Sequence, residues 1–226
     1  RMLRDNLVQS AVDVAHLETD AALGSGMSVA IEVAGGDYGA VVVSGANAAI
    51  PAGGLAARWA PLWGARVLLL QNEVPEAVNR AAAQAAKARG AWVILNAAPA
   101  RPVDPALLAL VDVLVVNRVE AAMLAGDAPE TLRAPSRDLI LTRGAEGLTL
   151  WPRAGGRLDL PATAVEVRST HGAGDAFCGT LAARLAAGDG LPAACAGARD
   201  AAGLFVAGAR DGSGAPGGPQ RPSDAL

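Results

Sequence analysis

The stretch from Thr163 to Gly188, which reads TAVEVRSTHGAGDAFCGTLAARLAAG, constrains the fold more than any other part of the chain. Its first residues are rich in β-branched side chains and predict a strand. Small residues at 172–174 predict a turn, and apolar residues then recur every four positions from Phe177 to Leu185, which predicts a helix that ends at Gly188. A strand, a glycine-rich turn and a helix in this order are typical of α/β proteins.

Asp175 occupies the first turn of that predicted helix, directly after the glycines. The first N–H groups of a helix have no partner within the helix and lie at its electropositive end, so an anion can bind there. A carboxylate beside such a position can take a proton from a hydroxyl, which then attacks a phosphorus held over the glycines. The same residues can also serve only as a dipole-complementing acid and a turn, and this stretch alone leaves both interpretations open.

Composition narrows the class of protein. Hydrophobic residues make up 52% of the 226 positions, which predicts a globular chain of about one domain. The net charge of −3, without a basic block, argues against nucleic acid and membrane surfaces as partners. The first residues do not resemble a secretory signal. Cys178 and Cys195 have no metal-ligand spacing and predict buried, reduced thiols in a cytoplasmic protein.

The rest of the chain predicts alternating strands and helices. Two β-branched runs at 27–33 and 38–43 flank Gly35-Gly36-Asp37 and predict a hairpin. Alternation of strand and helix in the middle of the chain predicts a parallel sheet with right-handed crossovers. We expect an opening helix over 3–14, strands at 66–70, 91–95, 112–116, 138–141, 148–151 and 157–160, and helices at 76–89, 105–110, from 117, and 191–207.

Polar residues follow several of these strands. Ligands in open α/β sheets lie beyond the carboxyl ends of the strands, where Glu73 is placed, although Glu73 could also complement the dipole of the next helix. Asn117 and Glu120 begin a helix with a spacing that puts both side chains toward one side. Such a pair can organise Mg²⁺ through water or form a capping box, and both roles can hold together.

Two common nucleotide-binding motifs are missing from the sequence. The single lysine, Lys87, lies outside any G-x-x-x-x-G-K-[ST] phosphate loop. The segment 172–177 lacks the third glycine of a dinucleotide-binding fingerprint, which makes a dehydrogenase the least supported class.

The segment Gly172-Ala173-Gly174-Asp175-Ala176-Phe177 resembles the C-terminal signature of the ribokinase-like (phosphofructokinase-B type) carbohydrate kinases. The resemblance covers essentially the whole chain and keeps the family order of motifs: the hairpin, then segments at 45–48, 71–75, 96–102, 117–120 and 142–147. It implies an α/β fold with a central mostly parallel sheet flanked by helices and a small β lid hairpin within 27–43. It also implies a single domain over 1–226 that is incomplete at its N-terminus.

The resemblance further implies an ATP-dependent kinase that phosphorylates a hydroxyl of a small sugar. Ribose, converted to ribose 5-phosphate, is favoured, and fructose, 2-keto-3-deoxygluconate, adenosine or a non-catalytic nucleotide-binding role are the alternatives. Asp175 would be the general base and contact the substrate together with Glu73. The implied phosphoryl-stabilising amides are those of Gly172, Ala173 and Gly174; the implied nucleotide-binding residues are Asn117, Thr142, Arg143, Gly144, Ala145, Glu146, Gly147, Gly174 and Arg199.

Asn117 and Glu120 would hold Mg²⁺ through water, and a homodimer through the lid is a further implication of the resemblance. The chain also departs from the family pattern. Ser169 stands where the signature has its first Asp, so the K⁺ site to which Ser169 and His171 would contribute is in doubt. Arg199 stands where family members often carry Asn or His, and we expect a further region before Arg1, because the family's first strands are not matched.

Overall fold

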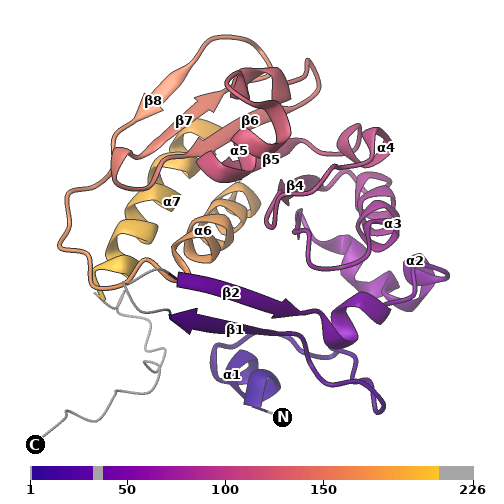
Figure 1. Cartoon of the computed structure of the whole chain (residues 1–226). Helices are drawn as coiled ribbons and strands as arrows, with labels where there is room; N and C mark the ends of the chain where they lie inside the picture. Colours follow the sequence, from indigo (N-terminus) through magenta and orange to yellow (C-terminus); the bar gives the residue numbers. More distant parts are fainter. Residues whose placement is uncertain (1, 33–37, 209–226) are drawn as a thin grey trace, which may run out of the picture.

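The computed structural model describes residues 2–32 and 38–208. Its centre is a six-stranded sheet with the order β3-β4-β5-β6-β7-β8 (Figure 1). The strands are β3 (Val67–Leu70), β4 (Trp92–Asn96), β5 (Val113–Asn117), β6 (Asp138–Thr142), β7 (Leu148–Trp151) and β8 (Leu158–Leu160). Strands β3 to β6 are parallel, and β7 and β8 are antiparallel to the strands before them. The prediction of a central, mostly parallel sheet is confirmed.

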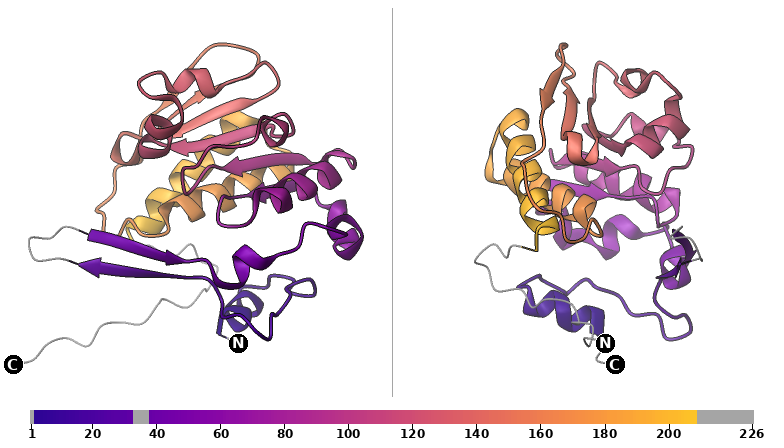
Figure 2. Two further views of the ribbon diagram at one scale, coloured as in Figure 1. Left: turned by 45° about the vertical axis from the view of Figure 1, so that its right-hand side comes forward. Right: turned by 60° about the vertical axis from the view of Figure 1, so that its left-hand side comes forward.

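Helices cover both faces of this sheet. The covering helices are α2 (Leu55–Arg58), α3 (Glu76–Lys87), α4 (Pro105–Leu108), α5 (Arg118–Ala125), α6 (Ala173–Ala187) and α7 (Leu191–Val206), whereas α1 (Met2–Gln9) lies apart from the sheet and has no buried residue (Figure 1). Short 3₁₀ turns are η1 (Gly45–Ala49), η2 (Ala60–Gly64), η3 (Pro129–Leu132) and η4 (Gly144–Glu146). α6 and α7 pack on one face, and α2 to α5 contribute to the core on the other (Figure 2). Among the helices of the described residues, none combines the length and apolar character needed to cross a membrane.

Alternate side chains of the central strands pack into opposite helical layers. In β4, Val93 and Leu95 pack with the α3 side, whereas Ile94 packs with α6 and α7. In β5, Leu114 faces the α3 side and Val115 the α6 side. Because both faces are covered, each strand reads as a continuous apolar run rather than as an alternating one. This explains why runs such as 112–116 predicted buried parallel strands correctly.

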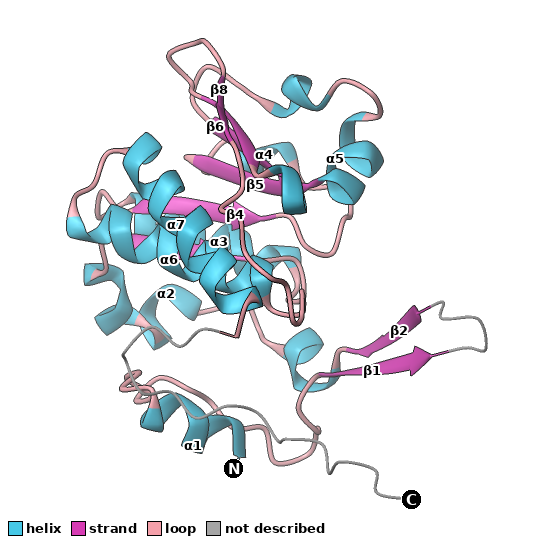
Figure 3. Ribbon diagram, turned by 90° about the vertical axis from the view of Figure 1, so that its left-hand side faces the viewer, coloured by secondary structure: helices cyan, strands magenta, loops and turns pink. Residues whose placement is uncertain are grey.

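The predicted hairpin is confirmed as a separate two-stranded sheet. β1 (Met27–Glu32) and β2 (Tyr38–Val43) are antiparallel, with Met27 opposite Val43. Its two strands project from the body of the protein, apart from the six-stranded sheet (Figure 3). The predicted turn residues, 35–37, lie outside the described residues.

One predicted strand is wrong: 163–167 forms no strand. This segment bonds to α7 instead, because the Thr163 hydroxyl donates to Asp200 Oδ1 at 2.5 Å and the Arg168 N–H donates to the Val206 carbonyl at 2.8 Å. β-branched composition therefore identified an extended segment but not its partner. The opening helix is also shorter than predicted, since α1 ends at Gln9 and Ala11 has a φ of 56°.

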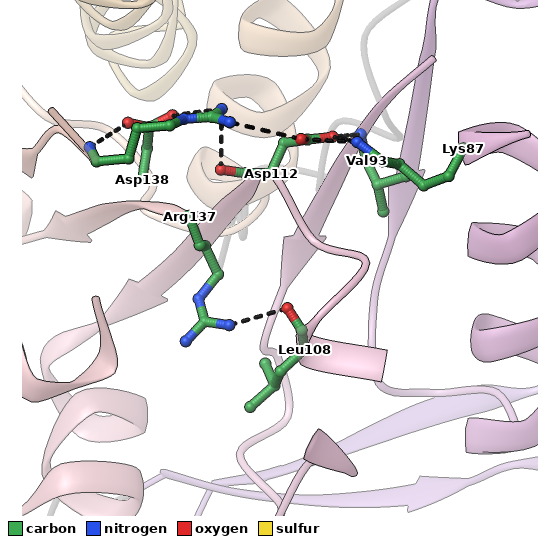
Figure 4. Close-up of polar contacts among 7 residues, drawn as sticks. Lys87, Val93, Leu108, Asp112, Arg137 and Asp138 are labelled. Carbon is green, nitrogen blue, oxygen red and sulfur yellow. Dashed lines mark hydrogen bonds and ion pairs between the residues drawn. The ribbon is translucent and has the colours of Figure 1, made fainter. Parts of the chain in front are cut away.

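A network of charged side chains joins the amino ends of the parallel strands (Figure 4). Both carboxylate oxygens of buried Asp112 accept from Lys87 Nζ, at 2.9 and 3.0 Å, and its Oδ2 also accepts from the Val93 N–H at 2.8 Å. Arg153 links Asp112 to Asp138, donating to Asp138 Oδ2 at 2.9 Å. Arg137 lies nearby and donates to the carbonyls of Leu108 and Leu132, which are at the ends of α4 and η3. The network fixes the starts of β4, β5 and β6 relative to one another.

We expect Asp112→Ala to lower the free energy of unfolding by about 1–3 kcal/mol, since it leaves the buried Val93 N–H without an acceptor and removes the ion pair with Lys87. Urea denaturation measures this change. Asp189→Ala is the matched control, because it breaks the more exposed Arg184–Asp189 pair and should cost under about 1 kcal/mol. Equal losses in the two variants would contradict the structural role of Asp112.

Candidate functional site

The residues of interest lie where the parallel strands end. Glu73 follows β3, Asn117 ends β5 and Thr142 ends β6. Asn117 and Thr142 are opposite one another in the parallel ladder. Because parallel strands point the same way, the segments after them leave from the same edge of the sheet, and this edge is where open α/β sheets bind ligands.

A cleft of about 470 Å³ opens between the hairpin and the segments that follow β3 and β4. The hairpin side contributes Met27 and Val43, and the sheet side contributes Asn72, Glu73 and Arg101. Both sides of the cleft mix polar and apolar residues, since the hairpin side also contributes Ser28 and the sheet side also contributes Val74. A small ligand with several hydroxyl groups would find hydrogen-bonding groups and apolar contacts on both sides.

Glu73 is exposed in this cleft, and its position is fixed by its own neighbours. Gln71 Nε2 donates to Glu73 Oε2 at 2.9 Å, and the Gln71 side chain also accepts from the Glu73 N–H. The backbone of Gln71 is held in turn, since Asn79 Nδ2 donates to its carbonyl at 2.7 Å. The acid in the first turn of α3 is Glu76, so the helix-dipole explanation fits Glu76 better than Glu73.

Sequence reasoning missed two residues of the cleft, Asn72 and Arg101. Asn72 is only 4% exposed; its Nδ2 donates to the Pro99 carbonyl at 3.0 Å, and its Oδ1 has no partner among the described residues. Arg101 Nη2 donates to the Val74 carbonyl at 2.9 Å. Together they join the segments after β3 and β4. The signal was available, because both residues lie in the segments that follow β3 and β4 at the ligand-binding edge.

Asn117 and Glu120 form a complete capping box at the start of α5. The Glu120 N–H donates to Asn117 Oδ1 at 2.9 Å, and Glu120 Oε2 accepts from the Asn117 N–H at 2.8 Å. Asn117 Nδ2 also donates to Glu120 Oε1 at 2.9 Å. Burial raises the pKa of Glu120, with the Asn117 N–H opposing that shift. The capping interpretation is thus confirmed, and the magnesium interpretation stays a prediction.

The donor set at this position suits a hydrated Mg²⁺ better than a directly bound one. Both oxygens of Glu120 already accept from Asn117, so a metal would contact them through water, as Mg²⁺ commonly does. Among the described residues, no group of three or more His, Cys, Asp or Glu side chains could hold a metal ion.

The segment 142–147 is a tight turn that contains η4. The Arg143 N–H donates to the Gly147 carbonyl at 2.7 Å and closes the turn. Gly147 has a φ of 87°, and a Cβ at this position would collide with the Leu160 carbonyl, so the position requires glycine. Gly144 and Ala145, in contrast, lie at the surface of the turn, where backbone groups could approach a ligand.

The glycine turn at 172–174 begins α6 as predicted. Gly172 is the N-cap, with a φ of 80°, and α6 starts at Ala173. The Ala173 N–H already donates to the Thr170 carbonyl at 3.2 Å, which leaves the amides of Gly174 and Asp175 as the better candidates to bind an anion. Asp175 is exposed, and in the described part of the chain its carboxylate takes no part in a hydrogen bond or ion pair.

Cys178 lies in α6, three residues after Asp175. Burial raises the pKa of its thiol to about 12, and the negative charges of Asp175 and Glu120 add to that shift. Cys195 is buried as well, and burial likewise raises the pKa of its thiol to about 12. The prediction of buried thiols is confirmed.

Ser169, His171 and Arg199 lie in surroundings that suit the predicted cation and nucleotide contacts less well. Ser169 Oγ accepts from the His171 N–H at 3.3 Å, so these two residues are adjacent, but they bring no carboxylate to a cation. Arg199 is held by Asp200, to which its Nε and Nη2 donate at 2.9 and 2.7 Å. Its guanidinium would have to leave Asp200 to reach a nucleotide.

This arrangement of sheet, hairpin and glycine-capped α6 is shared with a known class of proteins. Residues 1–216 match the pfkB family carbohydrate kinases, and the chain belongs to that family. Ribokinase from Bacillus subtilis (strain 168) is 32% identical over 215 residues, which cover 94% of this chain and 72% of the relative. Bifunctional protein HldE from Azotobacter vinelandii is 37% identical over 158 residues, covering 64% of this chain and 33% of the relative.

Some relatives are considerably longer than this chain. Ribokinase from Lactococcus lactis is 34% identical over 145 residues, covering 63% of this chain and 48% of the relative. The structure of Arabidopsis thaliana ribokinase complexed with ribose and ATP superimposes with a TM-score of 0.72 and 25% identity, covering 82% of this chain and 64% of that one. The chain thus spans about half to two thirds of the length of these two proteins.

Two glycines of the α6 turn allow structure and function to be separated. We expect Gly172→Ala to lower the free energy of unfolding by about 1–2 kcal/mol, because the position has positive φ and a Cβ would lie 3.1 Å from the Phe205 ring. Gly174→Ala meets no atom within 4 Å and should raise it by up to about 1 kcal/mol, since alanine favours the helix. Thermal unfolding of both variants checks the contrast; a loss of stability in Gly174→Ala would contradict this geometry.

Proposed function

We propose that the protein is an ATP-dependent kinase that transfers a phosphoryl group to a hydroxyl of a small sugar, with Asp175 as the general base. The observation that carries the proposal is the position of the exposed Asp175 carboxylate in the first turn of α6, directly after the glycine N-cap. Family membership supports the reaction class.

The Asp175 carboxylate would act on the reacting hydroxyl, and the amides at the start of α6 would act on the transferring phosphoryl group. The carboxylate takes the proton of the hydroxyl, whose oxygen then attacks the terminal phosphorus of ATP while the bond from that phosphorus to the ADP oxygen breaks. The Gly174 and Asp175 amides and the helix dipole favour the negative charge on the transferring group. A Cβ on residue 174 would stand beside this group, so Gly174→Ala should reduce turnover although it does not disturb the fold.

Asn117 and Glu120 would hold a hydrated Mg²⁺, which lowers the repulsion between the triphosphate and the carboxylates of the site. Thr142 to Gly147 would contact the nucleotide, because that turn leaves the neighbouring strand on the same edge. The hydrogen bonds between Asn117 and Glu120 keep these side chains in one orientation.

The sugar would bind in the cleft between the hairpin and Glu73. Glu73 would accept hydrogen bonds from hydroxyl groups, and Met27 and Val43 of the hairpin side would contact the carbon face of the ring. Ribose is our first choice, supported by the similarity to ribokinases. Fructose, 2-keto-3-deoxygluconate and adenosine are the other acceptors to be compared.

The hairpin would also join two copies of the chain. Met27, Val41, Val42 and Val43 are about half exposed, which is unusual for apolar side chains gathered on one two-stranded ribbon. Pairing of two hairpins would cover them. Light scattering of the purified protein, with Val42→Lys as the variant, reports the mass in solution; a monomeric wild type would exclude this dimer.

We expect Asp175→Asn to reduce turnover by about 10²- to 10⁴-fold, since the amide cannot accept the proton. ADP release with MgATP and ribose measures the loss. Asp127→Asn, which removes an exposed carboxylate at the far end of α5, is the matched control and should keep wild-type turnover. Near-normal turnover of Asp175→Asn with an unchanged melting temperature would show that another group is the base.

The acceptor is identified by the same assay with the four candidates. Release of ADP only with one acceptor assigns the substrate. ATP binding without transfer to any of them would support the alternative of a non-catalytic nucleotide-binding protein.

A further inference from the structure

Arg118 and Glu146 form an ion pair that bridges the two loops at the carboxyl ends of β5 and β6. Arg118 is the first residue of α5, directly after Asn117, and Glu146 lies in the η4 turn. The strands that carry them are neighbours, with Asn117 opposite Thr142. The pair therefore spans the place where, on the proposed function, the nucleotide would pass.

The Arg118–Glu146 ion pair can be broken at little cost in stability. The Arg118 and Glu146 side chains are 53% and 59% exposed, and ion pairs in such surroundings add little to stability. Arg118 holds the pKa of Glu146 below its usual range, mainly through their hydrogen bond, so Glu146 is charged at neutral pH. A second anion of higher charge can thus compete for the guanidinium at small cost to the fold.

The charges of the two loops single out Arg118 as the available cation. Arg143, the other arginine there, is less exposed and already donates to the Leu148 carbonyl and to Asp159. The lysine of the chain, Lys87, is bonded to Asp112 at the opposite end of the sheet. Glu120 and Asp175 bring negative charge near the same edge. A polyphosphate bound here needs a positive side chain, and a guanidinium can contact phosphate through two parallel hydrogen bonds.

We propose that Arg118 is a phosphate-binding residue whose side chain is held by Glu146 in the free protein and moves to the phosphates when a nucleoside triphosphate binds. Glu146 competes with the phosphate for Arg118. Its carboxylate pairs with the guanidinium before the nucleotide binds, and the incoming phosphate displaces it. This inference rests on the proposed function, because it concerns the same nucleotide site, but it assigns a role that the capping box and the glycine turns do not require.

Calorimetric titration of MgATP tests this exchange. We expect Arg118→Ala to weaken ATP binding by about 10- to 100-fold, the range for loss of a charge-assisted hydrogen bond, and to leave adenosine binding unchanged. Arg118→Lys should restore part of the affinity. Glu146→Gln should strengthen ATP binding by about two- to fivefold, because the competitor has lost its charge. The double variant should bind like Arg118→Ala.

Two matched controls isolate the effect from net charge. Arg157→Ala breaks the exposed Arg157–Asp159 pair, and Glu130→Gln removes an exposed carboxylate of η3; both should bind ATP as the wild type does. Equal ATP affinities in Arg118→Ala and Arg157→Ala would overturn the role of Arg118 alone. Weaker binding in Glu146→Gln would overturn the exchange, because the intact pair would then be what binding needs. A wild-type protein that binds no ATP would refute both this inference and the proposed function.

Discussion

The parallel pairing of β3 to β6 is the constraint on which the rest of the structure depends. Parallel strands must be joined by crossovers, and here the crossover helices α3, α4 and α5 cover one face of the sheet, while α6 and α7, which follow β8, cover the other. The core therefore divides into two layers, with Ile94 and Val115 facing α6 and α7 and Val93 and Leu114 facing the other side. The same direction of the strands delivers the loops after β3, β4, β5 and β6 to one edge, so the packing of the core and the assembly of the site have a single cause.

Sequence periodicity and composition predicted this frame well because local chemistry decides it. The central strands are continuous apolar runs, and Asn117 with Glu120 is a spacing that specifies a helix start by itself. The prediction of a strand at 163–167 was wrong because a distant contact decides the pairing of this segment. Thr163 bonds to Asp200 of α7, which lies 37 residues further along the chain. Propensity describes the conformation of a segment, whereas pairing depends on what the rest of the chain places beside it.

The candidate site shows the same division. Glu73, Asn117, Glu120 and Asp175 could be found from their positions after strands or at helix starts. Asn72 and Arg101 also lie in segments that follow strands, and the same reasoning could have found them. The pairing of Arg118 with Glu146 could not be found that way, because it depends on a contact between separate loops. The buried Asp112 network was also invisible, since Lys87, Asp112 and Arg153 carry no motif and meet only when three elements are assembled.

The two ends of the sheet use charge in opposite ways. At the amino ends, Asp112 and Asp138 are buried and saturated with donors, so these carboxylates can only hold the strands together. At the carboxyl ends, Asp175 and Glu73 are exposed and can still accept hydrogen bonds or protons. Such carboxylates add little to local stability, but a reaction requires them. Because the chain's lysine is bonded at the amino ends of the strands, arginine is the cation at the carboxyl ends. A guanidinium stays protonated beside carboxylates and substrate alike, so it can contribute charge to the site without becoming a second base that competes with Asp175 for the proton.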